Sequence, residues 1–518
     1  MDSSSSPFQP LHLLFIFLSL LVVFFFIKNK RRRFPPGPRG LPIIGNMLMI
    51  NQLTHRGLAR LSRRYGGIVY LRLGSLHTID VSTPEMARQI LQVQDNIFSN
   101  RPATIAIRYL TYDRADMVFP QYGPFWRKTR KLCVMKLFSR RRAESWASVH
   151  NEVEATLRAI AGRAGSPVSI GEMVFGLTSN MIYRAAFGLS PRQGLDEFAS
   201  ILNEFSKLFV AFNIADFIPW MGWIDPMGLK KRMERARKSL DRFIDSIIDD
   251  HAAKKKVGHG GEDDTDMVDD LLAYLDDGGD GNIKGMGRED DPQTILKLTR
   301  DNIKAIIIDV MFGGTETTAM TIEWAMAELM KCPEELSKVQ EELAQVVGLN
   351  RKVHESDLHN LPHLKCTIKE TMRLHPPIPL LLHEATEDAE IAGYFIPAGT
   401  RVTVNAWMIG RDKSVWVDPE TYRPDRFLKD GSADLKGNHF ELIPFGSGRR
   451  SCPGMQLGLY TVELTLAQLL HCFNWALPNG MKPSELDMRD EFGLTVPKAV
   501  RLVAIPTPPP ALPCFLTL

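Results

Sequence analysis

The chain has 518 residues, of which 44% are hydrophobic and 24% are charged, an ordinary composition for a globular protein. Its 63 Lys and Arg nearly balance its 60 Asp and Glu, so no overall charge points to a nucleic-acid partner. The six Cys residues are scattered without a Cys-x-x-Cys pair, which argues against a zinc site or a disulfide framework and fits a reducing compartment.

The first elements in chain order are an apolar segment and a proline-rich stretch. Residues 11–27 are mostly apolar and would span about 26 Å as a helix, close to the thickness of an endoplasmic reticulum bilayer. The basic residues at 28–33 place the rest of the chain on the cytosolic side. We therefore expect a single-pass anchor within residues 1–34; a cleaved signal peptide, the alternative, would need a small-residue cleavage site. Residues 35–46 are rich in proline and predict a stiff hinge.

The pattern of the residues that follow predicts a mainly α protein with a small β subdomain. Apolar and polar residues alternate over 68–80 on both sides of Gly74, which predicts a β-hairpin. Helices are expected at 84–93, from 122 onward, over most of 146–250, at 267–275 and at 299–331. The charged, Gly-rich segment 252–291 predicts a surface loop, and residues 506–518 predict a disordered tail.

The long helix predicted over residues 299–331 carries the first chemical motif. Gly313 and Gly314 each cost about 1 kcal/mol relative to Ala inside a helix, so they indicate close helix packing or a backbone opened toward a ligand. Glu316 and Thr317 follow, and a carboxyl beside a hydroxyl can pass protons through water to a reacting oxygen. The alternative is an ordinary core helix.

A second motif, the segment PFGSGRRSCPG, places Cys452 just ahead of an apolar, helix-prone stretch. A thiolate is a strong donor to iron, and a haem held by Cys favours O–O cleavage. Backbone N–H groups and the N-terminus of the next helix would tune the sulfur. Gly448 and Gly454 allow backbone to pass close to a ligand, Arg450 is a permanent cation suited to a propionate, and Phe445 would shield the sulfur. A glycine-rich loop around a structural Cys is the alternative.

The complete pattern resembles the cysteine loop of the cytochrome P-450 monooxygenases, and the sequence PFGSGRRSCPG resembles that of the plant microsomal branch. The pattern Phe-x-x-Gly-x-Arg-x-Cys-x-Gly is present at Phe445, Gly448, Arg450, Cys452 and Gly454. The resemblance implies the P-450 fold for one catalytic domain over residues 47–505, and a haem b whose iron is bound by Cys452. It also implies electrons from NADPH through a separate flavin reductase, since no Gly-x-Gly-x-x-Gly site is present. Basic residues such as Arg449 and Arg450 would help to dock this partner.

The same resemblance assigns roles to other positions. Trp126 and Arg130, one helical turn apart, are implied to bind a haem propionate; without the resemblance they would be a solvated basic face. His383 takes a position where related proteins place a propionate-binding Arg or His, with an ordinary loop His as the alternative. Glu316 and Thr317 match the oxygen-activating motif of the family.

A buried structural triad is implied by two further motifs. Glu370 and Arg373 form a Glu-x-x-Arg on a predicted helix, and Arg426 lies in a Tyr-Arg-Pro-Asp-Arg-Phe segment. In the family these three charges bind one another behind the haem, and leaving one unpaired should be severe. Read without the resemblance, the pair on the helix would contribute about a few tenths of a kcal/mol at the surface.

Longer stretches resemble the plant ferulate/coniferaldehyde 5-hydroxylases of syringyl lignin biosynthesis. They lie at 45–59, 96–117, 301–317, 375–385, 452–460, 471–475 and 480–488. This implies O2-dependent hydroxylation of a small aromatic substrate at C5 of a guaiacyl ring, in coniferaldehyde, coniferyl alcohol or ferulate. A flavonoid or coumaroyl-ester ring hydroxylase stays open, as do a haem-thiolate isomerase or dehydratase and a silent haem-binding scaffold. The aromatic residues between 205 and 223 are more often core; the resemblance implies that they roof the substrate cavity and dip into lipid.

Overall fold

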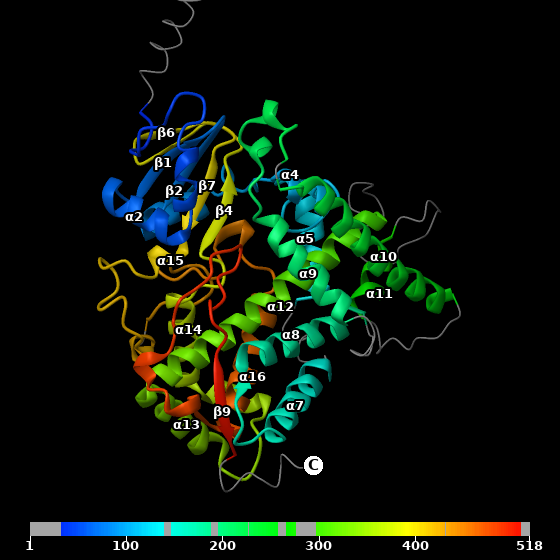
Figure 1. Ribbon diagram of the computed structural model, residues 1–518, viewed down its shortest axis with the longest axis vertical. Helices are drawn as coiled ribbons and strands as arrows, with labels where there is room; N and C mark the ends of the chain where they lie inside the picture. The colour runs from blue at the N-terminus through cyan, green and yellow to red at the C-terminus, as the bar shows by residue number, and fades with distance from the viewer. Residues whose placement is uncertain are drawn as a thin grey trace, which may run out of the picture.

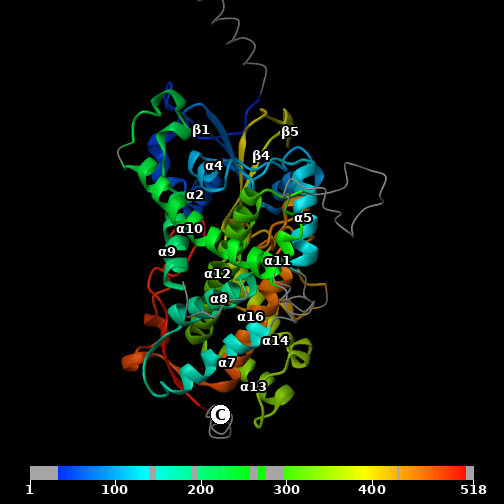
Figure 2. The same ribbon diagram turned by 90° about the vertical axis from the view of Figure 1, so that its right-hand side faces the viewer.

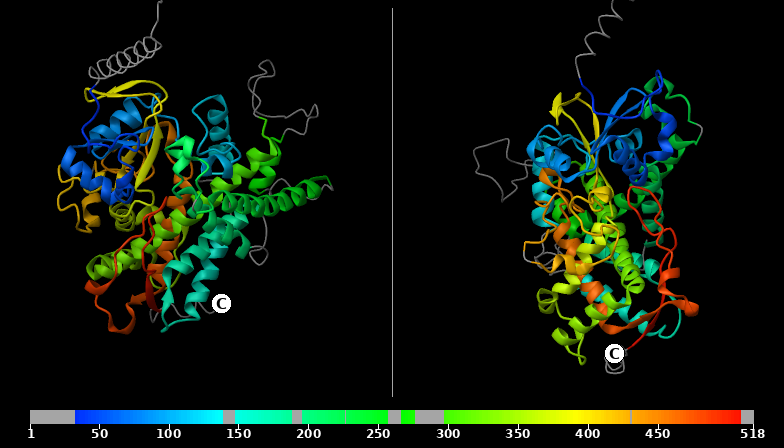
Figure 3. Two further views of the ribbon diagram at one scale, coloured as in Figure 1. Left: turned by 45° about the horizontal axis from the view of Figure 1, so that its top comes forward. Right: turned by 90° about the vertical axis from the view of Figure 1, so that its left-hand side faces the viewer.

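The computed structural model describes residues 33–138, 147–187, 195–225, 227–256, 266–275, 297–429 and 431–508. The expected anchor at 11–27, most of the expected loop at 252–291 and the end of the expected tail lie outside these residues and stay predictions. The described residues form a mainly helical molecule with a β-rich part at one end, as the sequence predicts (Figure 1). Figure 3 shows the same separation from two further sides.

The β-rich part is built on a four-stranded sheet with the order β1-β2-β7-β4. The strands are β1 (Ile68–Leu73), β2 (Leu76–Val81), β7 (Arg401–Asn405) and β4 (Leu380–Glu384). β1 and β2 form the predicted hairpin, antiparallel, with Ile68 opposite Val81. β2 then pairs in parallel with β7, and β7 pairs antiparallel with β4, so the N-terminal hairpin is joined to chain more than 300 residues away.

Two smaller sheets complete the β structure of the described residues. One has the order β3-β9-β8, with β3 (Val168–Ser169), β9 (Val503–Thr507) and β8 (Asn474–Ala476). The other pairs β5 (Ala389–Ile391) with β6 (Tyr394–Ile396). Strand β9 continues to Thr507, two residues into the segment predicted as a disordered tail, because the strand pairs on both edges.

Most of the remaining regular structure of the described residues is helical, and the helices predicted from the sequence are present. They are α2 (His55–Tyr65), α3 (Pro84–Arg88), α4 (Ile105–Leu110), α5 (Pro124–Lys136), α7 (Ala147–Ala161), α8 (Ile170–Phe187), α9 (Leu195–Phe209), α10 (Leu229–Lys256), α11 (Met267–Leu272), α12 (Arg300–Lys331), α13 (Pro333–Val347), α14 (Pro362–Leu374), α15 (Ala406–Ile409) and α16 (Met455–Cys472). The segment predicted to open the loop at 252 instead continues α10 to Lys256.

Helix α12 lies through the middle of the helical part, beside α8 and α16 (Figures 1 and 2). It begins at an N-cap, Thr299, whose hydroxyl accepts a hydrogen bond from Asn302 N. Its length and composition would allow it to cross a membrane, but 67% of its most apolar window is buried in protein. We therefore assign it as the core helix of the domain.

The two glycines of α12 have different surroundings. The sequence left open whether they serve close helix packing or open the backbone toward a ligand. A Cβ at Gly314 would lie 2.5 Å from Ile182 Cδ1, so this glycine permits close packing against α8. A Cβ at Gly313 would meet no protein atom within 4 Å. One glycine therefore serves helix packing, and the other faces open space.

Candidate active site

The cysteine loop is a tight turn that leads into helix α16. The N–H of Cys452 donates to Phe445 O at 2.8 Å, and the N–H of Ser451 donates to Gly448 O at 3.2 Å. Gly448 has φ +68°, and a Cβ there would lie 2.1 Å from Leu91 O. Only glycine fits this position, because a side chain would be both strained and in collision with backbone.

Asp95 holds this loop from outside, and the sequence did not single it out. Its Oδ2 accepts hydrogen bonds from Arg449 N and Arg449 Nη1, both at 3.1 Å. Its Oδ1 accepts one from Ser99 Oγ at 2.9 Å. The segment that follows α3 therefore anchors the loop that carries Cys452, across more than 350 residues of chain.

The thiol of Cys452 lies on an internal surface. Cys452 has surface accessible to water, but protein encloses the space around it. This enclosure desolvates the thiol and raises its pKa. The N–H of Gly454 and the charge of Arg130 act in the opposite direction and lower that pKa. A ligand that replaced water at the sulfur and carried positive charge would favour the thiolate further.

Three guanidinium groups gather beside Cys452, and two of them contact the indole of Trp126. Arg130 Nη2 donates to Ser451 O, next to the cysteine. The guanidinium carbons of Arg450 and Arg130 lie 4.3 Å and 5.5 Å from the centre of the Trp126 ring. Trp126 Nε1 donates to Met117 O at 3.2 Å. Trp126 and Arg130 therefore lie beside the cysteine loop, and their role toward a propionate stays a prediction.

The third guanidinium belongs to Arg101, which the sequence also missed. Burial lowers the pKa of Arg101 to about 10, with the neighbouring charge of Arg130 acting in the same direction. Burial lowers the pKa of Arg450 to about 9, again helped by its cationic neighbours. Arg101 Nε is buried and has no hydrogen-bond partner among the described residues. This group of cations therefore has room for anionic partners from outside the chain.

Arg450 is only 6% exposed, so the expectation that it helps to dock a reductase is wrong. Its guanidinium points inward and donates to Ser99 O at 2.7 Å, Pro120 O at 2.5 Å and Val118 O at 3.4 Å. Burial in a polar network prevents contact with a partner protein. Arg449, which is exposed, remains available for that role.

His383 lies on strand β4 rather than in a loop, and it is buried. Its Nδ1 is 2.8 Å from Phe98 O, so Nδ1 carries the proton. Burial lowers the pKa of His383 to about 3, with Arg101 and Arg450 contributing in the same direction. In this tautomer Nε2 holds a lone pair, so a carboxylate would be bound only after His383 gains a proton. Its role toward a propionate stays a prediction.

Glu316 and Thr317 lie on α12 near the open space at Gly313. Thr317 Oγ1 donates to Gly313 O at 2.6 Å, one turn earlier in the helix. Glu316 Oε2 accepts a hydrogen bond from Ser206 Oγ at 3.3 Å, which ties it to α9. A carboxyl and a hydroxyl are therefore present, partly exposed, in the middle of the helix next to Gly313.

An aromatic wall lies next to this part of α12. Phe312 packs against Phe209, with ring centres 5.3 Å apart, and against Phe205 at 6.0 Å. Phe209 also contacts Phe119 at 6.0 Å. Phe205 and Phe209 belong to the aromatic residues for which the sequence left two interpretations, core or roof. Both are buried, whereas Trp220 and Trp223 of the same segment are 70% and 80% exposed.

Two acids next to this wall were not recognised in the sequence. Asp309, on α12 one turn before Gly313, accepts hydrogen bonds from the N–H groups of Met117 and Val118. Burial raises the pKa of Asp309 to about 7. Asp116 is fully buried, and burial together with the nearby Asp309 raises its pKa well above the usual range. A lone acid within the apolar run KAIIIDVMF was the sequence signal for Asp309.

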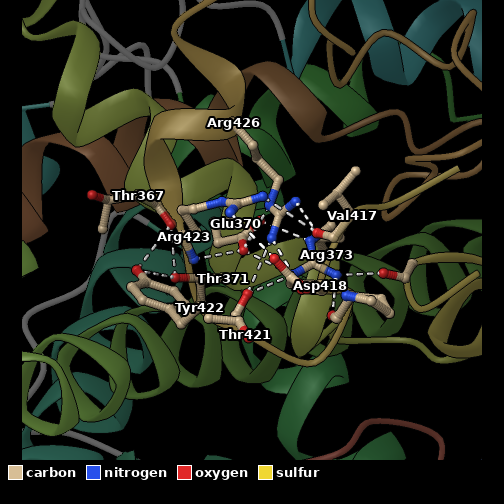
Figure 4. Close-up of polar contacts among 12 residues, drawn as sticks. Thr367, Glu370, Thr371, Arg373, Val417, Asp418, Thr421, Tyr422, Arg423 and Arg426 are labelled. Atoms are coloured by element: carbon tan, nitrogen blue, oxygen red, sulfur yellow. Dashed lines mark hydrogen bonds and ion pairs between the residues drawn. The ribbon is translucent and has the colours of Figure 1, made fainter. Parts of the chain in front are cut away.

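The predicted structural triad is present and buried (Figure 4). Glu370 Oε2 accepts from Arg373 Nε at 2.7 Å, and Glu370 Oε1 accepts from Arg373 Nη2 at 2.8 Å. Arg426 Nε donates to the same Oε1 at 3.1 Å. The side chains of Glu370 and Arg373 are 0% exposed, which excludes the interpretation as a surface pair.

Comparisons with known proteins agree with this geometry. A profile of the family described as Cytochrome P450 matches residues 35–502. Cytochrome P450 84A1 of Arabidopsis thaliana is 62% identical over 504 residues, 96% of each chain. Cytochrome P450 84A4 of the same plant is 56% identical over 481 residues, 92% of each chain. A zebra fish cytochrome P450 solved with abiraterone has a TM-score of 0.71 and 24% identity, covering 88% of this chain and 99% of its own, which supports the fold alone.

Proposed function

The chain belongs to the cytochrome P450 family, and from that premise we propose that it hydroxylates C5 of the guaiacyl ring of phenylpropanoids, using O2 and electrons from NADPH. Coniferaldehyde, coniferyl alcohol and ferulate are the proposed substrates, in syringyl lignin biosynthesis. Membership of the family implies a haem-thiolate monooxygenase with a reductase as redox partner. We also propose a single-pass anchor in the endoplasmic reticulum membrane, with the catalytic domain in the cytosol.

The residues around Cys452 fit a haem. A haem has two propionate groups, and Arg101, Arg130 and Arg450 form a largely buried cationic cluster beside the cysteine loop. The unpartnered Nε of Arg101 points to the same need for an anion. Cys452 would bind the iron and Arg130 would bind a propionate; the indole N–H of Trp126 is donated to Met117 O, so Trp126 would join Arg130 only by giving up that bond. A haem held by a cysteinate supplies cleavage of the O–O bond, with one oxygen atom entering the substrate and the other leaving as water.

In this proposal Glu316 and Thr317 move protons. Thr317 Oγ1 donates a hydrogen bond to Gly313 O, so its lone pairs are left to accept a hydrogen bond from water. Glu316 is bound by Ser206 and lies partly exposed, so it can exchange protons with solvent. The pair can thus deliver protons to a reacting oxygen next to Gly313, where a Cβ would meet no protein atom.

The aromatic wall supports the choice of substrate class, and it is the observation that carries the proposal. Phe312 precedes Gly313 in α12, its ring packs against that of Phe209, and Phe209 packs against Phe119. A flat aromatic ring would pack against them in an offset or edge-to-face arrangement. A wall of this kind holds a phenylpropanoid ring while excluding water from the reaction.

The test is turnover in microsomes that contain the full chain, a reductase and NADPH. Coniferaldehyde, ferulate, coniferyl alcohol, a flavanone and a coumaroyl ester are supplied together with isotope-labelled O2, and oxygen gain is followed by mass. We expect the 5-hydroxy product of a guaiacyl compound to form fastest, carrying the label. Conversion of only the flavanone or the ester would contradict the substrate. Microsomes with Cys452→Ala are the control, and we expect neither the thiolate-ligated haem spectrum nor turnover from them.

A further inference from the structure

The segment from Tyr112 to Phe119 has no regular secondary structure beyond its first turn, yet it borders the aromatic wall. It begins with three consecutive residues in the left-handed region, Tyr112 at φ 53°, Asp113 at 55° and Arg114 at 66°. None of them is glycine, so this conformation is unfavourable in itself. Such a turn persists only when the surrounding structure holds it in place.

Two carboxyl groups bind three consecutive backbone N–H groups of this segment. Asp309 Oδ2 accepts from Met117 N at 2.7 Å and from Val118 N at 3.1 Å. Asp116 Oδ1 accepts from Phe119 N at 3.1 Å. A strand or helix would satisfy these groups with backbone, whereas here the carboxyl oxygens of two acidic side chains accept the hydrogen bonds.

The carbonyl groups of the segment are bound by side chains as well. Asn302 Nδ2 donates to Ala115 O at 2.9 Å, and Trp126 Nε1 donates to Met117 O at 3.2 Å. Asn302 and Asp309 both come from α12, two turns apart. The helix that carries the proton-transfer pair therefore also holds the position of the pocket segment.

The residue positioned by these bonds is Phe119. Its backbone N–H is bound by Asp116, and its ring contacts Phe209, which in turn contacts Phe312 beside Gly313. A shift of the segment would move the Phe119 ring and change the width of the aromatic wall. It would leave Glu316 and Thr317 in place, because they belong to the continuous helix.

We propose that Asp309 is a positioning residue that sets substrate preference, acting through the segment 116–119 to hold Phe119 in the aromatic wall. The proposal rests on the proposed function for the identity of the substrate. The contact between Asp309 and the segment 116–119 does not depend on that function. Asp309 binds the segment and need not touch the substrate or transfer a proton. Its loss changes which ring is held, not how oxygen is activated.

The experiment compares four variants of the full chain, loaded with haem: Asp309→Ala, Asp309→Asn, Phe119→Leu and the double variant Asp309→Asn with Phe119→Leu. Asp301→Asn, an exposed acid at the start of the same helix, is the matched control. The first readout needs no activity: hydrogen exchange of the amides between residues 112 and 119. We expect exchange to be about tenfold faster or more in Asp309→Ala, because two hydrogen bonds are lost, and to be partly restored in Asp309→Asn, which keeps an acceptor oxygen.

The second readout is kinetic. With coniferaldehyde, we expect Asp309→Ala to raise KM by about tenfold while kcat changes by less than about twofold, since binding and not chemistry is affected. Selectivity over the analogue that lacks the methoxy group should fall in the same variant. Phe119→Leu should lose the same selectivity, and the double variant should lose no more than Phe119→Leu alone, because the two changes act on one element.

The proposal is overturned if exchange at 112–119 does not change in Asp309→Ala, or if the losses from Asp309→Asn and Phe119→Leu simply add. It is also overturned if Asp309→Ala lowers kcat with KM unchanged, which would place Asp309 in proton transfer. Failure of the proposed function looks different. Wild-type protein would then convert none of the guaiacyl compounds, while the exchange measurement would still decide whether Asp309 holds the segment. If Asp309→Ala does not fold, the exchange rates and selectivities of Asp309→Asn and the double variant decide whether Asp309 positions the segment 112–119 or not.

Discussion

Replacing Glu370 by Gln is the sharpest perturbation of the fold that the structure offers. Glu370 accepts four hydrogen bonds, two from Arg373, one from Arg426 Nε and one from Arg423 N at 2.8 Å (Figure 4). Gln would keep the size of the side chain but remove its charge. Its NH2 group, a hydrogen-bond donor, would face N–H donors of the neighbouring arginines. Arg373, which is 0% exposed, would become a buried cation without an anion.

The magnitude follows from this burial. Breaking a buried pair by removing one partner costs about 3–5 kcal/mol, because the remaining charge is neither hydrated nor paired. Arg373 keeps bonds to the carbonyls of Gly410, Pro419 and Thr421, so the lower half of this range is expected for Glu370→Gln. That corresponds to a fall of about two orders of magnitude or more in the ratio of folded to unfolded protein.

A urea titration that follows loss of the thiolate-ligated haem spectrum measures this effect as a shift of the midpoint. The matched control is Arg423→Ala. The side chain of Arg423 is 41% exposed and pairs with Asp418 at 3.5 Å, so its removal should cost about 0–1 kcal/mol. If Glu370→Gln shifts the midpoint no more than Arg423→Ala does, the argument from burial is wrong.

Three further predictions rest on single contacts. Gly448→Ala should destabilise the protein by about 2–5 kcal/mol and reduce haem retention, whereas Gly176→Ala, where a Cβ meets nothing within 4 Å, should be neutral or slightly stabilising in the same urea assay. Thr317→Ala should lower product formation by up to about 100-fold and divert NADPH oxidation to hydrogen peroxide, with Thr317→Ser restoring coupling; unchanged product per NADPH would remove Thr317 from the relay. Burial lowers the pKa of His251, but the hydrogen bond to Asp266 at 2.7 Å outweighs it and raises that pKa above its usual value. Stability from this pair is therefore complete below about pH 6.5 and is lost as pH rises through the raised pKa, so melting temperatures of wild type and His251→Gln should converge toward about pH 9 and differ most near about pH 6.

Much of the site could be predicted because its residues are adjacent in sequence. Phe445, Gly448, Cys452 and Gly454 lie within ten residues, and the structure places them in one tight turn before α16. Trp126 and Arg130 share a helical face by spacing alone, and they do meet the cysteine loop. The β-hairpin was visible from its alternation, and α12 from a long helical segment that ends before Pro333.

Other residues could not be predicted, because what they do depends on partners far away in the chain. Asp95 was one acid among many until the structure placed it against Arg449. Arg450 looked like an exposed docking cation, and burial gave it three backbone carbonyls as partners instead. Asp309 has no local motif beyond being an acid in an apolar helix.

The sequence by itself therefore determined the chemistry available to this protein: a cysteine in a glycine turn, an acid and a hydroxyl on a long helix, and three charges that need one another. Local spacing and hydrophobic period carry this information because backbone geometry repeats over a few residues. The tertiary structure alone decided which charges are buried, which glycine faces open space and how the segment 112–119 is held. Those outcomes depend on desolvation and on contacts between segments hundreds of residues apart, and no local pattern encodes either.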